Sequence, residues 1–353
     1  MKDRPQSDTT PSQHAGDGEP CYHSPPDDEW TGALKSLAAP VMPALHRPWV
    51  AGVASLLFIV VVLATTTRVS PPTALHGARP DTVGPGALEP FEFAAGSYTW
   101  LSRRVARQYE PLKRRIPPPE GFARIDVPEH SFAAWLRCLP VAPPDAPVKS
   151  GSRSVILAAD SPTLAAVIAL QPTQDRLLAG AALLVRLRAE YLWTESRLAA
   201  LGFHFTSGDY AAWPRWAAGM RPSVNGRDVT WQQQAEPDDS RTSYCAYLET
   251  LFRYASCYSV LDDTTAINDG SIAPGDIFLH ADRRRPQSVI VLDVATDRDG
   301  SVAVLLGDAG IPAQSFHVLR SPDDSPWFPL RRGSPILLSP GRDLHFNDLR
   351  RWK

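Results

Sequence analysis

The stretch SVIVLDVATDRDGSVAVLLGD, residues 288–308, contains two apolar runs that are separated by a short polar segment. Short runs rich in valine and leucine and bounded by turn residues are typical of strands. The polar segment, residues 297–300, reads Asp-Arg-Asp-Gly, which is typical of a tight turn between antiparallel strands. Short apolar segments also flank this hairpin, GDIFL (275–279) before it and SFHVL (315–319) after it. The sequence therefore predicts an antiparallel sheet towards the C-terminal end of the chain.

Two helical patterns precede the predicted sheet. The longer extends from about Gln174 to Leu201, with apolar residues at helical spacing and Gly202 at its end. The second extends from about Ser240 to Val260. Helices followed by a run of antiparallel strands predict the α+β class. Because this is also the layout of papain-like hydrolases, we expect a papain-like arrangement in which the long helix packs on the antiparallel sheet.

The N-terminal part of the sequence differs from the rest. Residues 1–47 are rich in proline and acidic side chains, which predicts a disordered arm. Residues 48–67 carry no charge, and as a helix they would span about 30 Å, the thickness of the hydrocarbon core of a bilayer. Residues 68–90 are rich in proline and glycine and predict a tether, and residues 91–353 form the predicted globular α+β domain. We therefore expect one transmembrane helix that anchors the domain.

The alternatives for residues 48–67 are a buried core helix and the apolar part of a cleaved signal peptide. A soluble core helix seldom stays uncharged for so long, and no small-residue cleavage signal follows the segment. Basic residues are nearly balanced on its two sides, so the orientation is inferred from the short arm that precedes a large domain. The expected location is the inner membrane, single-pass, with the C-terminal domain facing the periplasm or exterior.

The composition excludes several classes of protein. Lys and Arg total 36 against 38 Asp and Glu, and this net charge of −2 argues against a dedicated nucleic-acid binder. Four cysteines in 353 residues, with no CxxC pair, exclude a disulfide scaffold and a zinc ribbon. The histidines are scattered without metal-ligand spacing, and no glycine-rich phosphate loop is evident. The sequence therefore predicts no metal site and no cofactor.

Residue types that could carry chemistry are few. A papain-like site needs a thiolate at a helix N-terminus and a histidine on a following strand. The chain offers Cys245, early in the second predicted helix, with His280 or His317 on the strands that follow. A buried cysteine is more often a small hydrophobic residue. A loop-rich stretch supplies a candidate recognition surface, made of Trp213, Trp216 and Trp231.

Nine phrases follow one another along the chain: RIPPPEGFARI (115–125), SFAAWLRCLPV (131–141), RLRAEYLW (186–193), FHFTSGDYAAWPRWAAGMR (203–221), YLETLFRYAS (247–256), PGDIF (274–278), VIVLDVA (289–295), IPAQSFHVL (311–319) and SPWF (325–328). In this order and with these gaps they resemble an uncharacterised bacterial family, domain of unknown function 4846. The resemblance covers roughly residues 110–330. It implies a shared fold and an envelope location, and it carries no established reaction.

The usual pattern of that family resembles a papain-like thiol site. A Gln-Cys-Ala-Asp phrase opens its long helix, a Gly-His-Ala phrase precedes its VIVVD strand, and a glutamine lies on the next strand. On this chain the cysteine position is Gly180, the histidine position is Gln287 and the third position is Asp308. Glycine has no side chain, and an amide neither deprotonates a thiol nor carries a proton. The resemblance therefore implies a catalytically degenerate site, or a family site that was never catalytic.

Three functions remain open on the sequence alone. The first is a membrane-anchored envelope protein whose degenerate papain-like domain binds a peptidoglycan fragment, a peptide or a partner protein. The second is an active cysteine hydrolase, of peptidase or amidase type, that acts on cell-wall peptides. The third is a structural tether without a ligand.

Overall fold

The predicted hairpin of residues 288–308 is confirmed and lies at the centre of the main sheet. Strand β13 (Gln287–Thr296) pairs antiparallel with β14 (Val302–Asp308). The computed structural model describes residues 93, 98–101, 109–170, 180–282, 286–308, 310, 313–331, 333–339 and 341–353.

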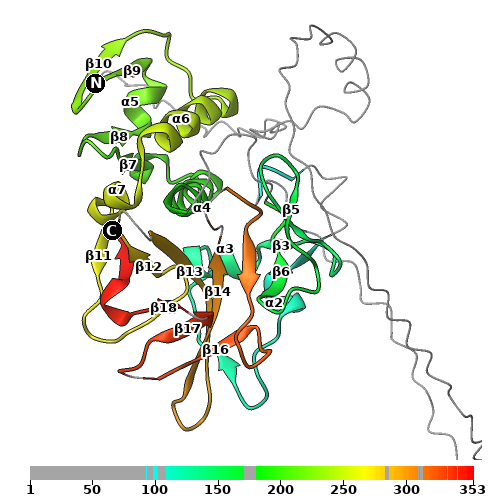
Figure 1. Ribbon diagram of the computed structural model, residues 1–353. Coiled ribbons are helices and arrows are strands. Elements are labelled where there is room, and N and C mark those ends of the chain that lie inside the picture. Colours follow the sequence, from blue (N-terminus) through cyan, green and yellow to red (C-terminus); the bar gives the residue numbers. More distant parts are fainter. Residues whose placement is uncertain are drawn as a thin grey trace, which may run out of the picture. The chain divides into compact units, whose positions relative to one another are not determined.

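The described strands of the main sheet all pair antiparallel, in the order β11-β19-β12-β13-β14-β15-β6, with β16 also paired to β14 and β2 to β13 (Figure 1). Its strands besides β13 and β14 are β11 (Thr264–Ala266), β19 (Leu349–Trp352), β12 (Ile277–His280), β15 (His317–Leu319), β6 (Leu164–Val167), β16 (Trp327–Leu330) and β2 (Ala123–Arg124). Strands close in space thus come from both ends of the described chain, because β2 and β6 join strands that follow them by more than a hundred residues.

Smaller two-stranded pairs surround the main sheet. They are β1 (Glu110–Pro111) with β3 (Pro140–Val141), β4 (Val148–Lys149) with β5 (Val155–Leu157), β7 (Gly202–His204) with β8 (Tyr210–Ala212), β9 (Met220–Asn225) with β10 (Asp228–Gln233), and β17 (Ile336–Ser339) with β18 (Arg342–Leu344). The helices are α2 (Leu112–Arg115), α3 (Phe132–Arg137), α4 (Ala181–Thr194), α5 (Trp213–Ala217), α6 (Arg241–Tyr254), α7 (Cys257–Asp262) and the short 3-10 turns η3 (Leu198–Ala200) and η4 (Phe346–Asp348).

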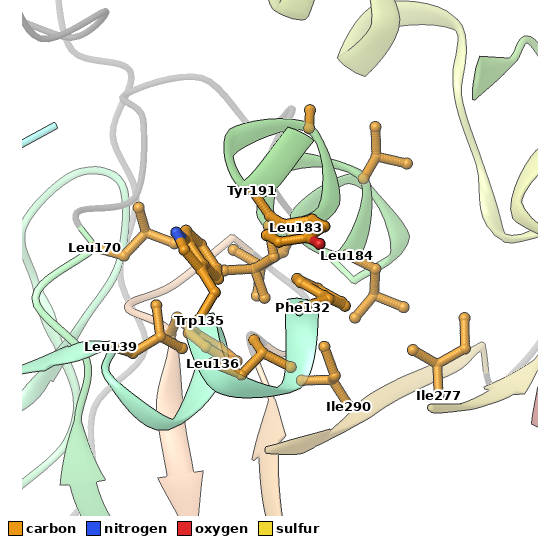
Figure 2. Packing of buried hydrophobic residues seen from close by; sticks show 14 of the residues in the cluster. Phe132, Trp135, Leu136, Leu139, Leu170, Leu183, Leu184, Tyr191, Ile277 and Ile290 are labelled. Atoms are coloured by element: carbon orange, nitrogen blue, oxygen red, sulfur yellow. The ribbon is translucent and has the colours of Figure 1, made fainter. Parts of the chain in front are cut away.

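Both faces of β13 are buried, which explains why its sequence is apolar without alternation. On one face, Ile290 packs with residues of α3 and α4; Figure 2 shows Phe132 and Trp135 of α3 between the sheet and Leu183 of α4. On the other face, Val289 and Val291 belong to a second cluster, which the hairpin β17–β18 and strand β16 help to cover. The sheet is therefore the central layer between two apolar cores.

The predicted papain-like α+β fold is wrong. Strands account for 33% of the described residues and helices for 24%, and no long helix packs on the sheet. In place of the predicted helix from Gln174 to Leu201, α4 has 14 residues and ends at Thr194. It ends there because Ser196, two residues later, has a φ of 52°, which a right-handed helix cannot contain. The start of that predicted helix, residues 174–179, lies outside the described residues.

The second predicted helix is interrupted before it reaches Val260. Ala255 is extended, with φ −82° and ψ 152°, so α6 ends at Tyr254. Ser256 then caps a new helix, α7, through a capping box with Ser259. A single long helix is thus replaced by two short ones.

The predicted inner-membrane location is also contradicted. Across the ranges that the structure describes, no helix combines the length and the apolar character that crossing a membrane requires. The predicted arm (1–47), transmembrane helix (48–67) and tether (68–90) lie outside the described residues.

One charged residue lies inside the apolar strand β13. Asp293, next to a bulge in the pairing with β14, is 1% exposed. Its two carboxylate oxygens accept hydrogen bonds from Nε of Arg124 and Nε of Arg137, both at 2.6 Å. Arg124 is on β2 and Arg137 is the last residue of α3, so this carboxylate joins both elements to β13. The two ion pairs therefore hold α3 and β2 to the central strand β13.

Candidate functional site

A cavity of about 460 Å³ lies where β13 begins and β14 ends. The hairpins β4–β5 and β17–β18, strand β15 and the N-terminus of α4 contribute to its wall. Its described lining residues are Ile156, Leu157, Thr163, Gly180, Pro286, Gln287, Ser288, Asp308, Gly310, Gln314, His317, Leu319, Arg320, Leu338, Ser339 and Arg342. The wall is thus partly aliphatic and partly made of amide, hydroxyl, imidazole and charged groups.

The register of the sheet explains why the polar groups gather. His317 on β15 is paired with Asp308 on β14, and Asp308 is paired with Val289 on β13. Paired residues share a face, and Gln287 shares the face of Val289 because it is two residues away. The side chains of Gln287, Asp308 and His317 are therefore on one side of the sheet, at the ends of adjacent strands.

The three positions that the family resemblance indicated, Gly180, Gln287 and Asp308, all line this cavity. Gln287 and Asp308 come from the sheet, whereas Gly180 comes from the N-terminal end of α4. Gly180 has a φ of 57°, which favours glycine, and it caps α4 without a side-chain hydrogen bond. Of the residues predicted from the thiol-site layout, His317 lines the same cavity.

Asp308 is buried, and both of its carboxylate oxygens have hydrogen-bond partners. It is 3% exposed, its Oδ1 accepts a hydrogen bond of 3.0 Å from the N–H of Gly310, and its Oδ2 pairs with Arg342 of β18. The side chain of Arg342 is one-third exposed and makes no other hydrogen bond to a described residue. Arg342 was not predicted, because nothing in the sequence indicates that β18 folds against the end of β14.

Burial favours the neutral form of the His317 imidazole. It is 3% exposed, and its Nδ1 lies 3.1 Å from the carbonyl oxygen of Ser315. Burial lowers the pKa of His317, and the nearby Asp308 carboxylate only partly opposes this effect. With Nδ1–H donating to a carbonyl, Nε2 is the unprotonated ring nitrogen.

The other histidine and cysteine of the alternative thiol site lie elsewhere. His280, at the end of β12, is half exposed, with its Nδ1 3.2 Å from Asp348. Cys245 is on α6 and is disulfide-bonded. Neither residue belongs to the described cavity lining. The structure therefore does not bring Cys245 together with His280 or His317 at this site.

A different cysteine lies at the N-terminal end of α4. Cys257, the first residue of α7, is a free thiol, and its sulfur interacts with the backbone N–H of Ala181. Burial raises the pKa of Cys257, and the hydrogen bond from Ala181 only partly offsets this. Cys257 is not a lining residue of the cavity. A thiol thus lies next to position 180, but its environment favours the unreactive protonated form.

We expect iodoacetamide to modify Cys257 slowly at pH 7, more slowly than it modifies N-acetylcysteine. The thiolate is the reactive species, and each unit by which the pKa is raised lowers the thiolate fraction at pH 7 about tenfold. The rate is expected to increase about tenfold per pH unit until the pH passes the raised pKa. Mass spectrometry of the alkylated protein, without reductant, measures the rate at Cys257 and shows Cys245 unmodified. Rapid alkylation of Cys257 at pH 7 would contradict this assignment.

The three tryptophans do not form one exposed surface. Trp213 is 2% and Trp216 is 4% exposed, and Nε1 of Trp216 donates to the hydroxyl of Ser243. Trp231, on β10, is half-buried between the ring of Phe205 and the guanidinium of Arg215. The side chains of Trp213 and Trp216 are therefore core residues, and a ligand would not reach them.

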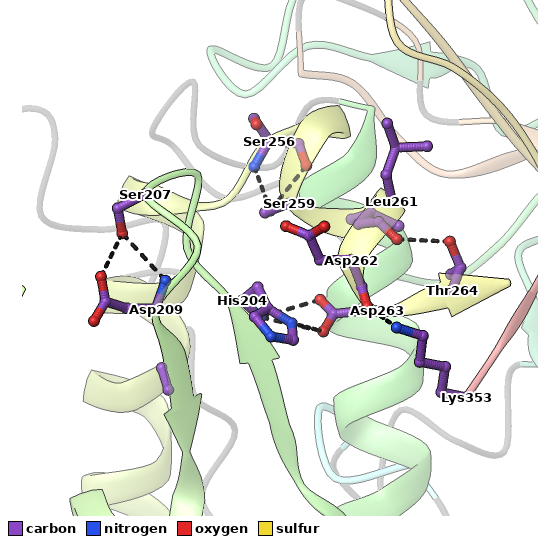
Figure 3. A network of polar contacts seen from close by, with 12 residues as sticks. His204, Ser207, Asp209, Ser256, Ser259, Leu261, Asp262, Asp263, Thr264 and Lys353 are labelled. Atoms are coloured by element: carbon purple, nitrogen blue, oxygen red, sulfur yellow. Dashed lines mark hydrogen bonds and ion pairs between the residues drawn. The ribbon is translucent and has the colours of Figure 1, made fainter. Parts of the chain in front are cut away.

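A second polar cluster was not predicted. His204 of β7 lies with Nδ1 2.6 Å from Asp263, which also accepts the backbone N–H of His204 (Figure 3). Burial raises the pKa of Asp263, and the hydrogen bonds from His204 oppose this effect. Since Asp263 follows α7 directly, the contact links the end of α7 to β7. No sequence signal connects two residues that are 59 positions apart.

Within the described ranges, no group of three or more His, Cys, Asp or Glu side chains is arranged to hold a metal ion.

Comparison with known proteins finds one match, to a family model. No curated protein and no solved structure matches the chain. A family model described as "Domain of unknown function (4846)" matches residues 112–351, which is more than half of the chain. The chain therefore belongs to the family of domain of unknown function 4846.

Proposed function

We propose that this domain binds a small peptide-like ligand in the cavity and leaves its bonds intact. The observation that carries the proposal is that Gly180, Gln287 and Asp308 line one cavity. A glycine, an amide and an ion-paired carboxylate provide neither a nucleophile nor a base for a thiol reaction. A site with this lining has the chemistry of recognition.

The remaining imidazole and thiols do not provide a nucleophile paired with a base. Nε2 of His317 could accept a proton, but no hydroxyl or thiol of the described residues is hydrogen-bonded to its ring. Cys245, the nucleophile of the alternative hydrolase, is disulfide-bonded and lies outside the described lining. These observations favour binding over cleavage.

The size and lining of the cavity favour a small ligand over a protein surface. Its volume of about 460 Å³ falls in the range of small-molecule sites, roughly 300–1,000 Å³. The side-chain amides of Gln287 and Gln314 can each donate to a carbonyl and accept from an N–H, which is the pattern of a peptide bond. The ligand class is therefore a short peptide, with the peptide portion of a peptidoglycan fragment as one example.

Thermal unfolding of the full chain with added muropeptides tests this proposal. A ligand that binds the native state is expected to raise the unfolding temperature with concentration, because 100 times Kd adds about 2.7 kcal/mol of stability. Mass spectrometry after the incubation is expected to recover the muropeptide intact.

A pair of variants locates the binding. Ser339→Trp places a large ring in the cavity wall and is expected to abolish the shift, whereas Ser334→Trp, on the exposed turn before the same hairpin, is expected to preserve it. The proposal fails if no muropeptide or short peptide stabilises the protein, or if the peptide is hydrolysed.

A further inference from the structure

We infer that the cavity selects a ligand in which a carboxylate, received by Arg342, is joined to an aliphatic group that packs on Ile156. This inference rests on the proposed function and specifies the chemical class of the ligand. It follows from three features of the lining: an arginine held in place with unused donors, two arginines against one carboxylate, and an apolar part of the same cavity.

Arg342 is oriented before a ligand arrives. One terminal nitrogen pairs with Oδ2 of Asp308, which is buried and held in turn by the N–H of Gly310. A guanidinium has five N–H donors in a planar fork, and the others of Arg342 have no hydrogen-bond partner among the described residues. A planar fork with free donors matches the two oxygens of a carboxylate. The Asp308 pair fixes this fork at the cavity wall.

The charges of the lining favour an anion. The described lining contains two guanidinium groups, those of Arg320 and Arg342, and one carboxylate, that of Asp308, while burial lowers the pKa of His317 and favours its neutral form. Arg320 is held by the carbonyl of Leu164 through Nε and by Asp324 through Nη1, and Asp324 is 88% exposed and lies outside the described lining. Among the described lining residues, two arginines thus stand against one carboxylate, and the exposed Asp324 outside the lining is the only acidic partner of Arg320 that the structure shows, so a ligand carboxylate would add favourable charge.

The same cavity also has an apolar part. Ile156 of β5 is 38% exposed although it lines the cavity, and Leu338 of β17 belongs to the wall and is buried. An aliphatic group that covers Ile156 would remove its exposed surface from water, which favours binding. Leu337, the neighbour of Leu338, is 56% exposed and is not a lining residue, because successive side chains of a strand point to opposite sides.

Three probes separate the contributions on the unmodified full chain: N-acetyl-Ala-Leu with a free carboxylate, its C-terminal amide, and N-acetyl-Gly-Gly with a free carboxylate. Calorimetry is expected to give the tightest binding for N-acetyl-Ala-Leu. The amide is expected to bind about 10- to 100-fold more weakly, since it loses a charge-assisted hydrogen-bond pair. N-acetyl-Gly-Gly is expected to bind at least about 10-fold more weakly, because it lacks the aliphatic side chain.

Variants assign the selectivity to residues. Arg342→Gln, or Arg342→Lys where the glutamine variant is unstable, is expected to bring the affinities of acid and amide within about threefold of each other. Arg298→Gln, on the exposed turn between β13 and β14, removes the same charge outside the cavity and is expected to keep the discrimination. Ile156→Ser is expected to reduce the advantage of the leucine probe, and Leu337→Ser to leave it unchanged.

The outcomes distinguish the inference from the proposed function. If peptides bind but acid and amide bind equally to the unmodified protein, the carboxylate inference is wrong and the binding function stands. If discrimination persists in both Arg342 variants, the assignment to Arg342 is wrong. If no probe and no muropeptide binds, the proposed function fails and this inference fails with it.

Discussion

Replacing Asp293 by alanine is expected to lower the free energy of unfolding by about 3–5 kcal/mol. The carboxylate is 2% exposed in its side chain, and it is the partner of Arg137, whose side chain is 10% exposed. Removing one member of a buried ion pair leaves the other charge without compensation, and this penalty is larger than the net worth of the intact pair. Arg124 loses the same partner but is less buried, so Arg137 accounts for most of the loss.

Urea unfolding of the full chain measures this effect as a shift of the midpoint at constant slope. Asp299→Ala is the matched control, because Asp299 is an exposed carboxylate in the turn that follows the same strand. A surface substitution of this kind is expected to change the stability by less than about 0.5 kcal/mol. A loss below about 1 kcal/mol for Asp293→Ala would show that the ion pair does not hold α3 and β2 to the sheet.

The hairpin was predictable because its signals are local. The apolar runs of β13 and β14 and the turn between them lie within 21 consecutive residues, and turn chemistry sets the pairing of such neighbours. The pairing partners of β2 and β6 were not predictable in the same way, because each strand joins the sheet through a distant segment. The error about the fold class follows from this difference, since most of the strand content comes from short segments without a clear period.

The helix ends show a similar limit. Ser256 and Ser259 form a capping box, but a serine at the second position departs from the usual glutamate or glutamine, and the helical pattern continues through it in the sequence. The end of α4 depends on the backbone of Ser196, which has a positive φ although it is not glycine. Such a residue is stabilised by the surrounding structure, so the sequence alone gives no indication of it.

The candidate site was predicted in part. Comparison with the family pattern indicated Gly180, Gln287 and Asp308, and the register of the sheet explains why the last two lie on one face. Arg342 and Arg320 were missed because their contribution depends on chain segments that meet only in the folded protein. The sequence shows where a motif departs from its family, whereas only the structure shows which charged residues surround those positions.

The tryptophan-rich stretch illustrates why composition alone does not identify a binding surface. A tryptophan in a loop-rich segment can either bind a ligand or fill a core, and both uses favour the same residue type. In this protein Trp213 begins α5 and packs against the rings of Trp193, Tyr244 and Tyr247, with centroids 5.6, 5.8 and 5.5 Å away. Its location inside this aromatic cluster predicts an effect on stability.

Trp213→Ala is expected to lower the free energy of unfolding by about 3–5 kcal/mol, as is usual when a buried aromatic residue is truncated. The loss combines the buried area of the ring, the cavity left behind and three edge-on ring contacts. Tyr258→Ala is the control, because Tyr258 is an aromatic residue that is 44% exposed, and its loss is expected to cost less than about 0.5 kcal/mol. Urea unfolding of both variants measures the difference.

A binding measurement completes this test, because a core role and a ligand-binding role of Trp213 predict opposite results. If Trp213 is a core residue, the fraction of the Trp213→Ala variant that remains folded at low temperature binds N-acetyl-Ala-Leu with unchanged affinity, since Trp213 is not among the lining residues of the cavity. If Trp213 contacts the ligand, affinity falls while stability changes little. The first pattern is expected, because a side chain with 2% exposure has almost no surface left to offer a ligand.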